Sequence, residues 1–242
     1  MRNHRPHRNS TNRTFVTVGM LLLLGTFPLG QPAMAQGRIL DQGVLRVVVG
    51  GTEIAREEFT VTVGSAVAGG AGLRITATAF YPPRRTKITI SPLVELGPDS
   101  MPRLVQFEAT NGDHERILAQ IGPRRLTIRR ISSRGESAHE YPGAPRTMIV
   151  DDSVFALYAV PPGTASGTVR LVSPRRDVRE NYDLTNRGVE ETVVAGERMK
   201  LLHLVLTRGA DVRHLWYDAS GRLMKVEIPS RRLYAERVLP SD

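Results

Sequence analysis

Apolar and polar residues alternate along most of the chain downstream of residue 36. Residues 45–49 begin the pattern, and after Gly50-Gly51 it resumes over residues 59–63. Successive side chains of a β-strand point to opposite faces, so this spacing gives each segment one apolar face. The two segments and the Gly-Gly turn predict a β-hairpin, and residues 73–79 continue the pattern as a third strand.

A second hairpin is predicted where residues 105–108 and 117–121 flank Asn111-Gly112, because Asn-Gly readily adopts the positive φ angles of a tight turn. Further strands follow at intervals of about ten residues, as in a meander of hairpins. They are predicted at 126–131, 168–172, 179–185, 189–194, 199–207, 212–217, 223–228 and 233–238, with turns at 186–188 and 218–221.

One segment has helical spacing instead. Val154, Leu157 and Tyr158 follow Asp151-Asp152, which predicts a short helix with aspartate caps that ends before Pro161. Two prolines and two glycines in residues 135–145 predict a long surface connection, and residues 64–72 predict a Gly/Ala-rich loop. The fold class is therefore mainly β: a large curved antiparallel meander sheet, a half-barrel or open barrel, with one short helix.

Two of the predicted strands, residues 45–49 and 201–206, are apolar on both faces. A strand of an open sheet with one face in water does not have this composition. The second face has three potential covers: the short helix, the curl of the sheet on itself, or an apolar guest. The sequence leaves these three alternatives open.

The N-terminus has the pattern of a secretory signal. Four arginines precede the apolar residues 15–29, and Ala33-Met34-Ala35 follows as a signal-peptidase site. We predict a signal peptide over residues 1–35, export to the periplasm or beyond, and a single β-rich domain over residues 36–242; an uncleaved N-terminal anchor is the alternative. The sequence contains no cysteine, which excludes disulfides, thiolate chemistry and a lipid anchor on cysteine.

Removal of the four arginines lowers the formal net charge from +9 to +5. The remaining arginine pairs are scattered and poorly interleaved with aromatic residues, so we expect no nucleic-acid partner. Peripheral contact with acidic lipid head groups stays open.

No arrangement of residues indicates a reaction, a metal or a cofactor. Neighbouring carboxylates on a strand, Glu57-Glu58 and Glu190-Glu191, point to opposite faces, and Asp151-Asp152 is interpreted as a cap. The histidines lack the close spacing of a metal site, and there is no Gly-x-Ser-x-Gly turn and no phosphate-binding glycine loop.

The only tryptophan, Trp216, either anchors the core or faces a cavity, where it would report a bound ligand. His203 and His214 are expected to approach each other across paired strands. If Trp216 faces a cavity, the ligand-binding residues are predicted to be Tyr158, His203, Leu206, His214 and Trp216.

The segment from Trp216 to Lys225 reads W-Y-D-x-x-G-x-L-x-K. It resembles a module of uncharacterised bacterial envelope proteins in which such a hairpin closes a meander. The Gly-Gly turn and the Asp-Asp pair before the short helix look like the same module. Its architecture is similar to that of periplasmic lipoprotein-carrier half-barrels, whose curved sheet wraps helices and holds acyl chains. The resemblance implies no catalytic residues, and the single short helix departs from the several helices of those carriers.

Three hypotheses about function follow. The first is a non-catalytic exported envelope protein that binds an apolar or lipid-like ligand in the concavity of the curved sheet. The second is a structural or assembly subunit that pairs with envelope proteins through its strand edges and arginine-rich faces. The third is a hydrolase or lyase with an unrecognised site.

Overall fold

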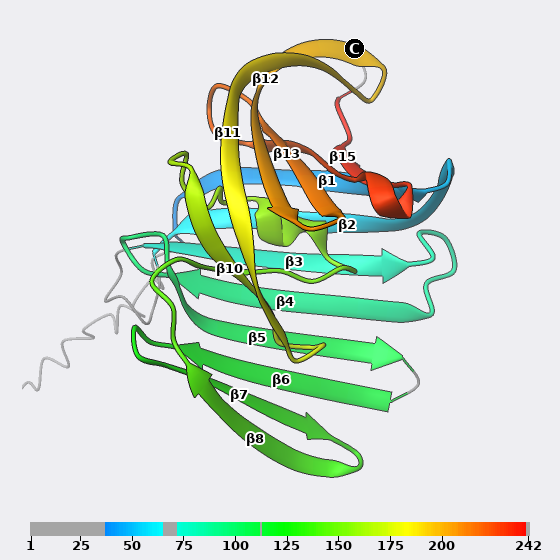
Figure 1. Cartoon of the computed structure of the whole chain (residues 1–242). Coiled ribbons are helices and arrows are strands. Elements are labelled where there is room, and N and C mark those ends of the chain that lie inside the picture. The colour runs from blue at the N-terminus through cyan, green and yellow to red at the C-terminus, as the bar shows by residue number, and fades with distance from the viewer. Residues whose placement is uncertain (1–36, 65–71, 112, 241–242) are drawn as a thin grey trace, which may run out of the picture. The chain divides into compact units, whose positions relative to one another are not determined.

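A computed structural model describes residues 37–64, 72–111 and 113–240, and these form one sheet of fifteen strands (Figure 1). The predicted signal peptide, most of the predicted loop at 64–72 and Gly112 of the Asn-Gly turn lie outside the described residues. The strands are β1 Ile39–Val49, β2 Thr52–Val63, β3 Leu73–Tyr81, β4 Ile88–Leu96, β5 Pro102–Asn111, β6 Asp113–Ile121, β7 Arg125–Ser132, β8 Gly135–Pro142, β9 Thr147–Ile149, β10 Gly167–Ser173, β11 Val178–Val194, β12 Glu197–Arg208, β13 Asp211–Tyr217, β14 Leu223–Ile228 and β15 Leu233–Arg237. Two short 3-10 helices, η2 Phe155–Tyr158 and η3 Pro229–Arg231, complete the described elements.

The strand order is that of two meanders joined at their ends. Strands β1 to β8 pair in sequence order, β10 to β15 do the same, and β15 pairs with β1. All pairs are antiparallel except β9 with β10. The sheet curves, so that β10 and β11 cross in front of β3 and β4 in Figure 1. The predicted curved, mainly β fold is confirmed.

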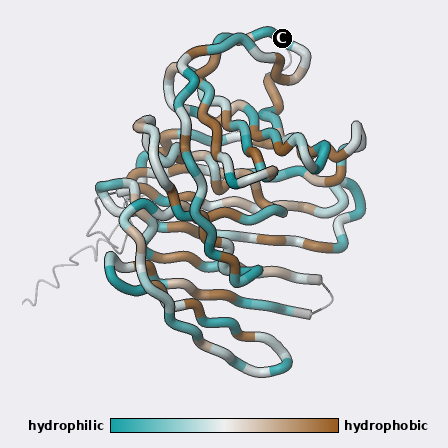
Figure 2. Tube along the Cα trace, viewed as in Figure 1, coloured by the Kyte–Doolittle hydropathy of each residue, from teal (hydrophilic) through white to brown (hydrophobic). Residues whose placement is uncertain are grey.

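Apolar and polar residues alternate along the strands in Figure 2, as the period-two pattern predicts. Strand β4, which the sequence analysis did not predict, also has buried residues at every second position from Ile90 to Leu96, with Pro92 among them. The pairing of β3 with β4 passes from Thr76↔Leu93 directly to Ala79↔Ile90, which leaves Pro92 and Ser91 out of this ladder.

Two predicted connections between strands are wrong. The segment expected to be a long surface connection contains β8, which pairs with β7 in unbroken register and exposes seven of its eight residues. The turn expected at 186–188 is a β-bulge within the continuous strand β11, where the register to β12 shifts between Asn186 and Gly188. Gly188 has a φ of 81°, so turn-forming residues bend this strand without ending it.

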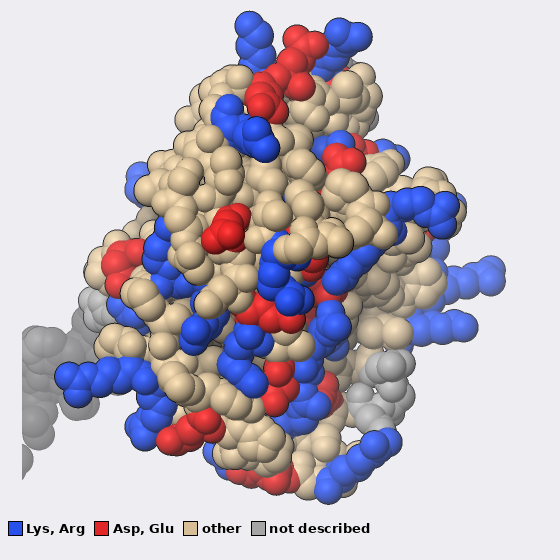
Figure 3. Space-filling model, viewed as in Figure 1, with Lys and Arg blue, Asp and Glu red and all other residues tan. Residues whose placement is uncertain are grey.

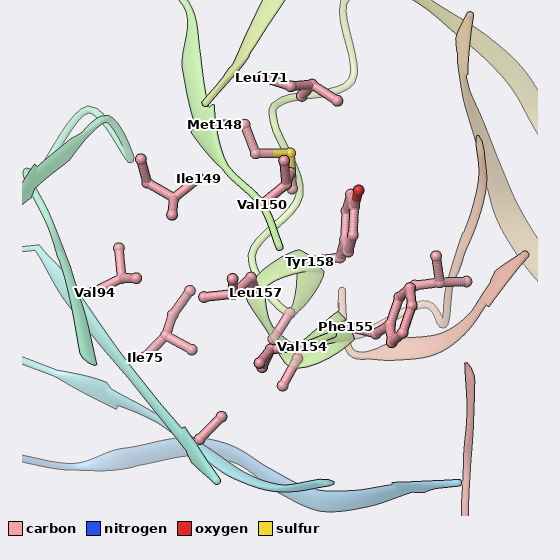
Figure 4. Packing of buried hydrophobic residues seen from close by; sticks show 14 of the residues in the cluster. Ile75, Val94, Met148, Ile149, Val150, Val154, Phe155, Leu157, Tyr158 and Leu171 are labelled. Atoms are coloured by element: carbon pink, nitrogen blue, oxygen red, sulfur yellow. The ribbon is translucent and has the colours of Figure 1, made fainter. Parts of the chain in front are cut away.

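The predicted short helix is present as η2, and it lies inside the sheet. All four of its residues are buried, and it contacts β2, β3 and β14. Figure 4 shows Phe155, Leu157 and Tyr158 among core side chains such as Ile75 and Leu171. We call residues 147–160 the plug.

The predicted aspartate caps are wrong. Glu57 on β2 accepts the backbone N–H groups of Phe155 and Ala156 at 2.9 and 2.8 Å. Asp151 instead accepts the N–H of Ser153 at 2.8 Å and pairs with Arg175. A carboxylate distant in sequence therefore caps the helix, which local sequence cannot reveal.

Other sheet side chains hold the remaining polar groups of the plug. Tyr217 donates to the carbonyl of Tyr158 at 2.9 Å, and Tyr81 donates to the carbonyl of Ser153 at 2.7 Å. The Arg213 guanidinium bonds the Tyr158 hydroxyl at 2.8 Å. These bonds satisfy irregular backbone that has no ladder partner, as buried polar groups require.

The two terminal strands, β8 and β9, are not paired with each other. Side chains bridge the gap: the Tyr141 hydroxyl on β8 donates to Asp177 at 2.8 Å, and the Arg179 guanidinium stacks 3.4 Å from the centre of the Tyr141 ring. Arg130 on β7 also donates to the carbonyl of Arg175. These contacts fasten β7 and β8 to the β10–β11 turn and to β11, while the sheet itself stays open between β8 and β9.

Replacing Glu57 tests the cap. Glu57→Ala leaves two buried N–H groups without an acceptor, and we expect the free energy of unfolding to fall by about 3 kcal/mol in urea titrations. The adjacent Glu58 is exposed and is the matched control. Glu58→Ala is expected to change the free energy by less than about 0.5 kcal/mol, and equal losses in both variants would contradict the cap.

Burial raises the pKa of Glu57 from 4.5 to about 8, against the effect of the two N–H bonds. Between these pH values the folded protein holds a proton that the unfolded chain releases. The contribution of Glu57 to the free energy of unfolding therefore falls as the pH rises from about 4.5 to about 8. In urea titrations across this pH range, the wild type is expected to lose stability relative to Glu57→Gln. A difference in free energy of unfolding that does not change with pH would refute the raised pKa of Glu57.

Candidate functional site

The hairpin of β11 and β12 bends back over the outer face of its own sheet. At its tip the N–H of Ala195 donates to Glu236 on β15 at 3.0 Å, and Arg46 on β1 pairs with the same carboxylate. Beneath the bend lies a second small core made of Val194, Leu201, Trp216 and Met224. The curl of the sheet on itself therefore covers the outer face of β12.

The inner face of β12 is covered as well. Leu204 and Leu206 are fully buried in the main core, which includes the plug residues Phe155 and Leu157. A void of about 30 Å³ remains between the plug and β3 to β5. Larger pockets open at the two ends of the concave side: one of about 580 Å³ beside Ile90, and one of about 760 Å³ beside Val61. The doubly apolar strand is thus explained by the chain's own packing, which requires no ligand against β12. A ligand in the concavity of the sheet stays a prediction.

The bent hairpin borders an open groove with a volume of about 1210 Å³. The other walls are β1 to β3, the turn between β13 and β14, and the residues after β15. Its apolar lining is contributed by Phe59, Met199, Leu201, Met224 and Leu239. The second small core is therefore also the floor of an open groove.

Polar groups frame this floor. Asp218 and Arg222 form an ion pair at 2.6 Å in the β13–β14 turn, and Lys200 projects from β12. Opposite them, Glu58 and Thr60 line the groove from β2. A groove with an apolar floor and a polar rim suits an amphiphilic ligand.

One wall of the groove contains a buried cation. Arg237 is 8% exposed, pairs with Asp41 at 2.6 Å and donates to the carbonyl of Leu223 at 2.8 Å. Its guanidinium also lies 5.1 Å from the centre of the Phe59 ring. Because a buried charge needs such partners, we interpret Arg237 as a brace that holds β1, β14 and β15 together beneath the groove.

Three of the five predicted site residues come together on the outer face. His203 on β12 lies opposite Trp216 on β13, with 3.6 Å between ring centres. The Nε2 of His203 lies 2.9 Å from the Nδ1 of His214, and its Nδ1 lies 2.6 Å from Glu190. The predicted approach of the two histidines is confirmed.

Burial lowers the pKa of both His203 and His214 below its ordinary value, against the nearby carboxylates. Both imidazoles are therefore neutral near pH 7, and one hydrogen bond between them is consistent with that state. This cluster borders the second small core through Trp216 and is not part of the groove lining.

The other two predicted residues lie on the opposite face of the sheet. Tyr158 belongs to the plug and Leu206 points into the main core, and neither is exposed. The five residues cannot form one site, because positions 203 and 206 of a strand point to opposite faces.

The groove residues Met199, Met224 and Leu239 were missed by the sequence analysis. Met224 faces the groove because a bulge between β13 and β14 shifts the register after Trp216. Leu239 follows the last strand, where no periodicity exists to interpret. Only the doubly apolar composition of β12 indicated that its outer face is covered.

Within the described residues, no three His, Cys, Asp or Glu side chains are placed to hold a metal ion. Over the same part of the chain, no helix has the length and apolar character needed to cross a bilayer. The neighbouring carboxylates Glu57 and Glu58 face opposite sides, one buried and one exposed, as predicted.

The fold resembles that of a solved β-barrel-like protein of the domain of unknown function DUF1849 from Brucella abortus. The TM-score is 0.51 at 8% sequence identity, and the match covers 81% of this chain and 94% of that one. No protein-family model and no curated protein matches the chain. At this identity the likeness establishes a β-barrel-like architecture alone.

Trp216 reports the protonation of the histidine cluster, because it is the only tryptophan and a protonated imidazole quenches a neighbouring indole. We expect tryptophan fluorescence to fall with a midpoint below pH 6.5, since the pKa of each histidine is lowered. The double variant His203→Asn/His214→Asn should remove the transition, and His139→Asn, on the exposed strand β8, should leave it. A midpoint at or above 6.5 would contradict the buried neutral pair.

Proposed function

We propose that this chain is a non-catalytic exported protein that binds an apolar or lipid-like ligand in the groove beneath the bent β11–β12 hairpin. The observation that carries the proposal is the groove itself, whose floor consists of Met199 and Leu239 together with the nearly buried Leu201 and Met224. Ligand sites are typically concave, with an apolar lining and a few polar groups.

The size of the groove supports this assignment. Ligand sites usually measure about 300–1,000 Å³, and this groove, at about 1210 Å³, has room for a chain-bearing molecule. The centre of the concave side holds only a void of about 30 Å³, and the pockets at its two ends, of about 580 and 760 Å³, are smaller than the groove. We therefore assign the ligand to the outer groove, in contrast to the carrier half-barrels that the sequence resembles.

The charged groups of the groove argue for binding rather than chemistry. Asp218 is engaged with Arg222, and Arg237 with Asp41. These ion pairs stabilise the walls of the groove. Among the described lining residues, no nucleophile is hydrogen bonded to a base. A hydrolase or lyase is not part of our proposal.

A second candidate is an assembly subunit of an envelope complex, favoured by β8. This strand is a regular edge of the sheet with seven exposed residues, and its outer side has no strand partner among the described residues. Such an edge accepts an additional strand from another protein. Location in the periplasm, or beyond the cell, belongs to both proposals and rests on the N-terminal sequence pattern.

A charge on the apolar floor tests the groove. Met199→Glu is expected to weaken the binding of a fluorescent long-chain fatty acid at least about tenfold, because the new carboxylate lies unpaired against apolar surface. Val189→Glu introduces the same charge on the same hairpin at a side chain that is 68% exposed and outside the groove. It should leave the affinity unchanged.

Failure of the wild type to bind the probe, or equal weakening in both variants, removes the groove proposal. Native mass spectrometry of the protein purified from its own host separates the two candidates. A bound small molecule that Met199→Glu loses supports ligand binding. A second polypeptide without a small molecule supports the assembly role.

A further inference from the structure

Five cations gather at one end of the barrel, which we call the basic end: Arg84, Arg85, Lys87, Arg134 and Arg232. The antiparallel order places the β3–β4 and β7–β8 connections at the same end as η3, which leads from β14 into β15. All five side chains are exposed, and within the described residues none forms an ion pair. Figure 3 shows Lys and Arg side chains projecting from the right flank with few acidic neighbours.

The backbone that carries these cations is held in place. The N–H of Lys87 donates to the carbonyl of Tyr81, and that of Arg232 to the carbonyl of Pro229, each at 2.9 Å. Arg85 and Arg232 adopt positive φ angles of 57° and 50° in their turns. The turns therefore present the charges outward from fixed positions.

Among the described residues, no large apolar side chain is exposed at the basic end, and the apolar residues of the pocket that opens there, such as Ile90 and Ala109, are buried inside the sheet. The large apolar residues that are exposed in the described part of the chain all lie elsewhere, at the start of β1, on β11 and after β15: Ile39, Leu40, Val189, Val193 and Val238. Protein interfaces usually contain an apolar or aromatic core inside a polar rim. Charges spread over several turns without such a core fit a broad anionic surface instead.

We propose that the basic end docks the protein on the head groups of an anionic lipid bilayer. Each exposed Lys or Arg near such a surface strengthens binding roughly fivefold, and several act together. The contact is electrostatic, so salt screens it over about one Debye length. The groove opens toward the opposite end, beside the β13–β14 turn and residues 238–240, so docking leaves it accessible. The proposal stands independently of the groove ligand.

Vesicle sedimentation of the full mature chain tests the docking. Binding is expected to vesicles that contain phosphatidylglycerol and to be absent with phosphatidylcholine alone, and high salt should release the protein. The double variant Arg84→Gln/Lys87→Gln should lower the partition coefficient roughly 25-fold. It leaves the positive φ of Arg85 untouched, and an unchanged thermal midpoint confirms its fold.

The matched control is Arg38→Gln/Arg124→Gln. It removes the same charge from exposed residues at the opposite end that form no ion pair within the described residues. It should bind vesicles as the wild type does. Equal losses in both double variants would show that net charge alone acts and would overturn the proposal. So would binding to phosphatidylcholine, or a polyanion such as DNA that binds more tightly than the vesicles through the same residues.

Discussion

The structure depends on one constraint: the buried backbone N–H and C=O groups of the plug need hydrogen-bond partners. An irregular segment inside a sheet has N–H and C=O groups that no ladder can pair, and each unpaired group costs about 1–3 kcal/mol. Glu57, Tyr81 and Tyr217 supply the partners from β2, β3 and β13. These strands lie in different parts of the sheet, so the same bonds also fasten the curved sheet around its core.

Enclosing the plug has a consequence for where a ligand can bind. The plug fills the centre of the concave side, where a void of about 30 Å³ remains, and pockets of about 580 and 760 Å³ lie at its two ends. The outer face gains a groove because the β11–β12 hairpin bends back and Ala195 at its tip bonds Glu236. A bulge at Asn186–Gly188 accompanies this long, bent hairpin. The groove and the exposed positive charges of the basic end thereby lie toward opposite ends of the sheet.

Much of the fold was predictable because its determinants are local. Alternation along β1, β2 and β3, and turn residues such as Gly50-Gly51 and Asp218–Gly221, specify hairpins within short stretches of chain. The histidine cluster was also accessible, since His203 and His214 sit on adjacent strands whose register follows from the turn at 209–210. The groove was not, because its walls come from β2, β12 and the residues after β15, which only the curl of the sheet brings together.

The sequence by itself determined the class of fold, the pairing of neighbouring strands and the need to cover both faces of β12. Tertiary structure alone decided what covers each face, which carboxylate caps η2 and which side of the sheet stays open. Period-two patterning fixes only the face on which a side chain lies, and it carries no information about what lies opposite. Contacts such as Glu57 with Phe155, about one hundred residues apart, depend on how the whole sheet curves.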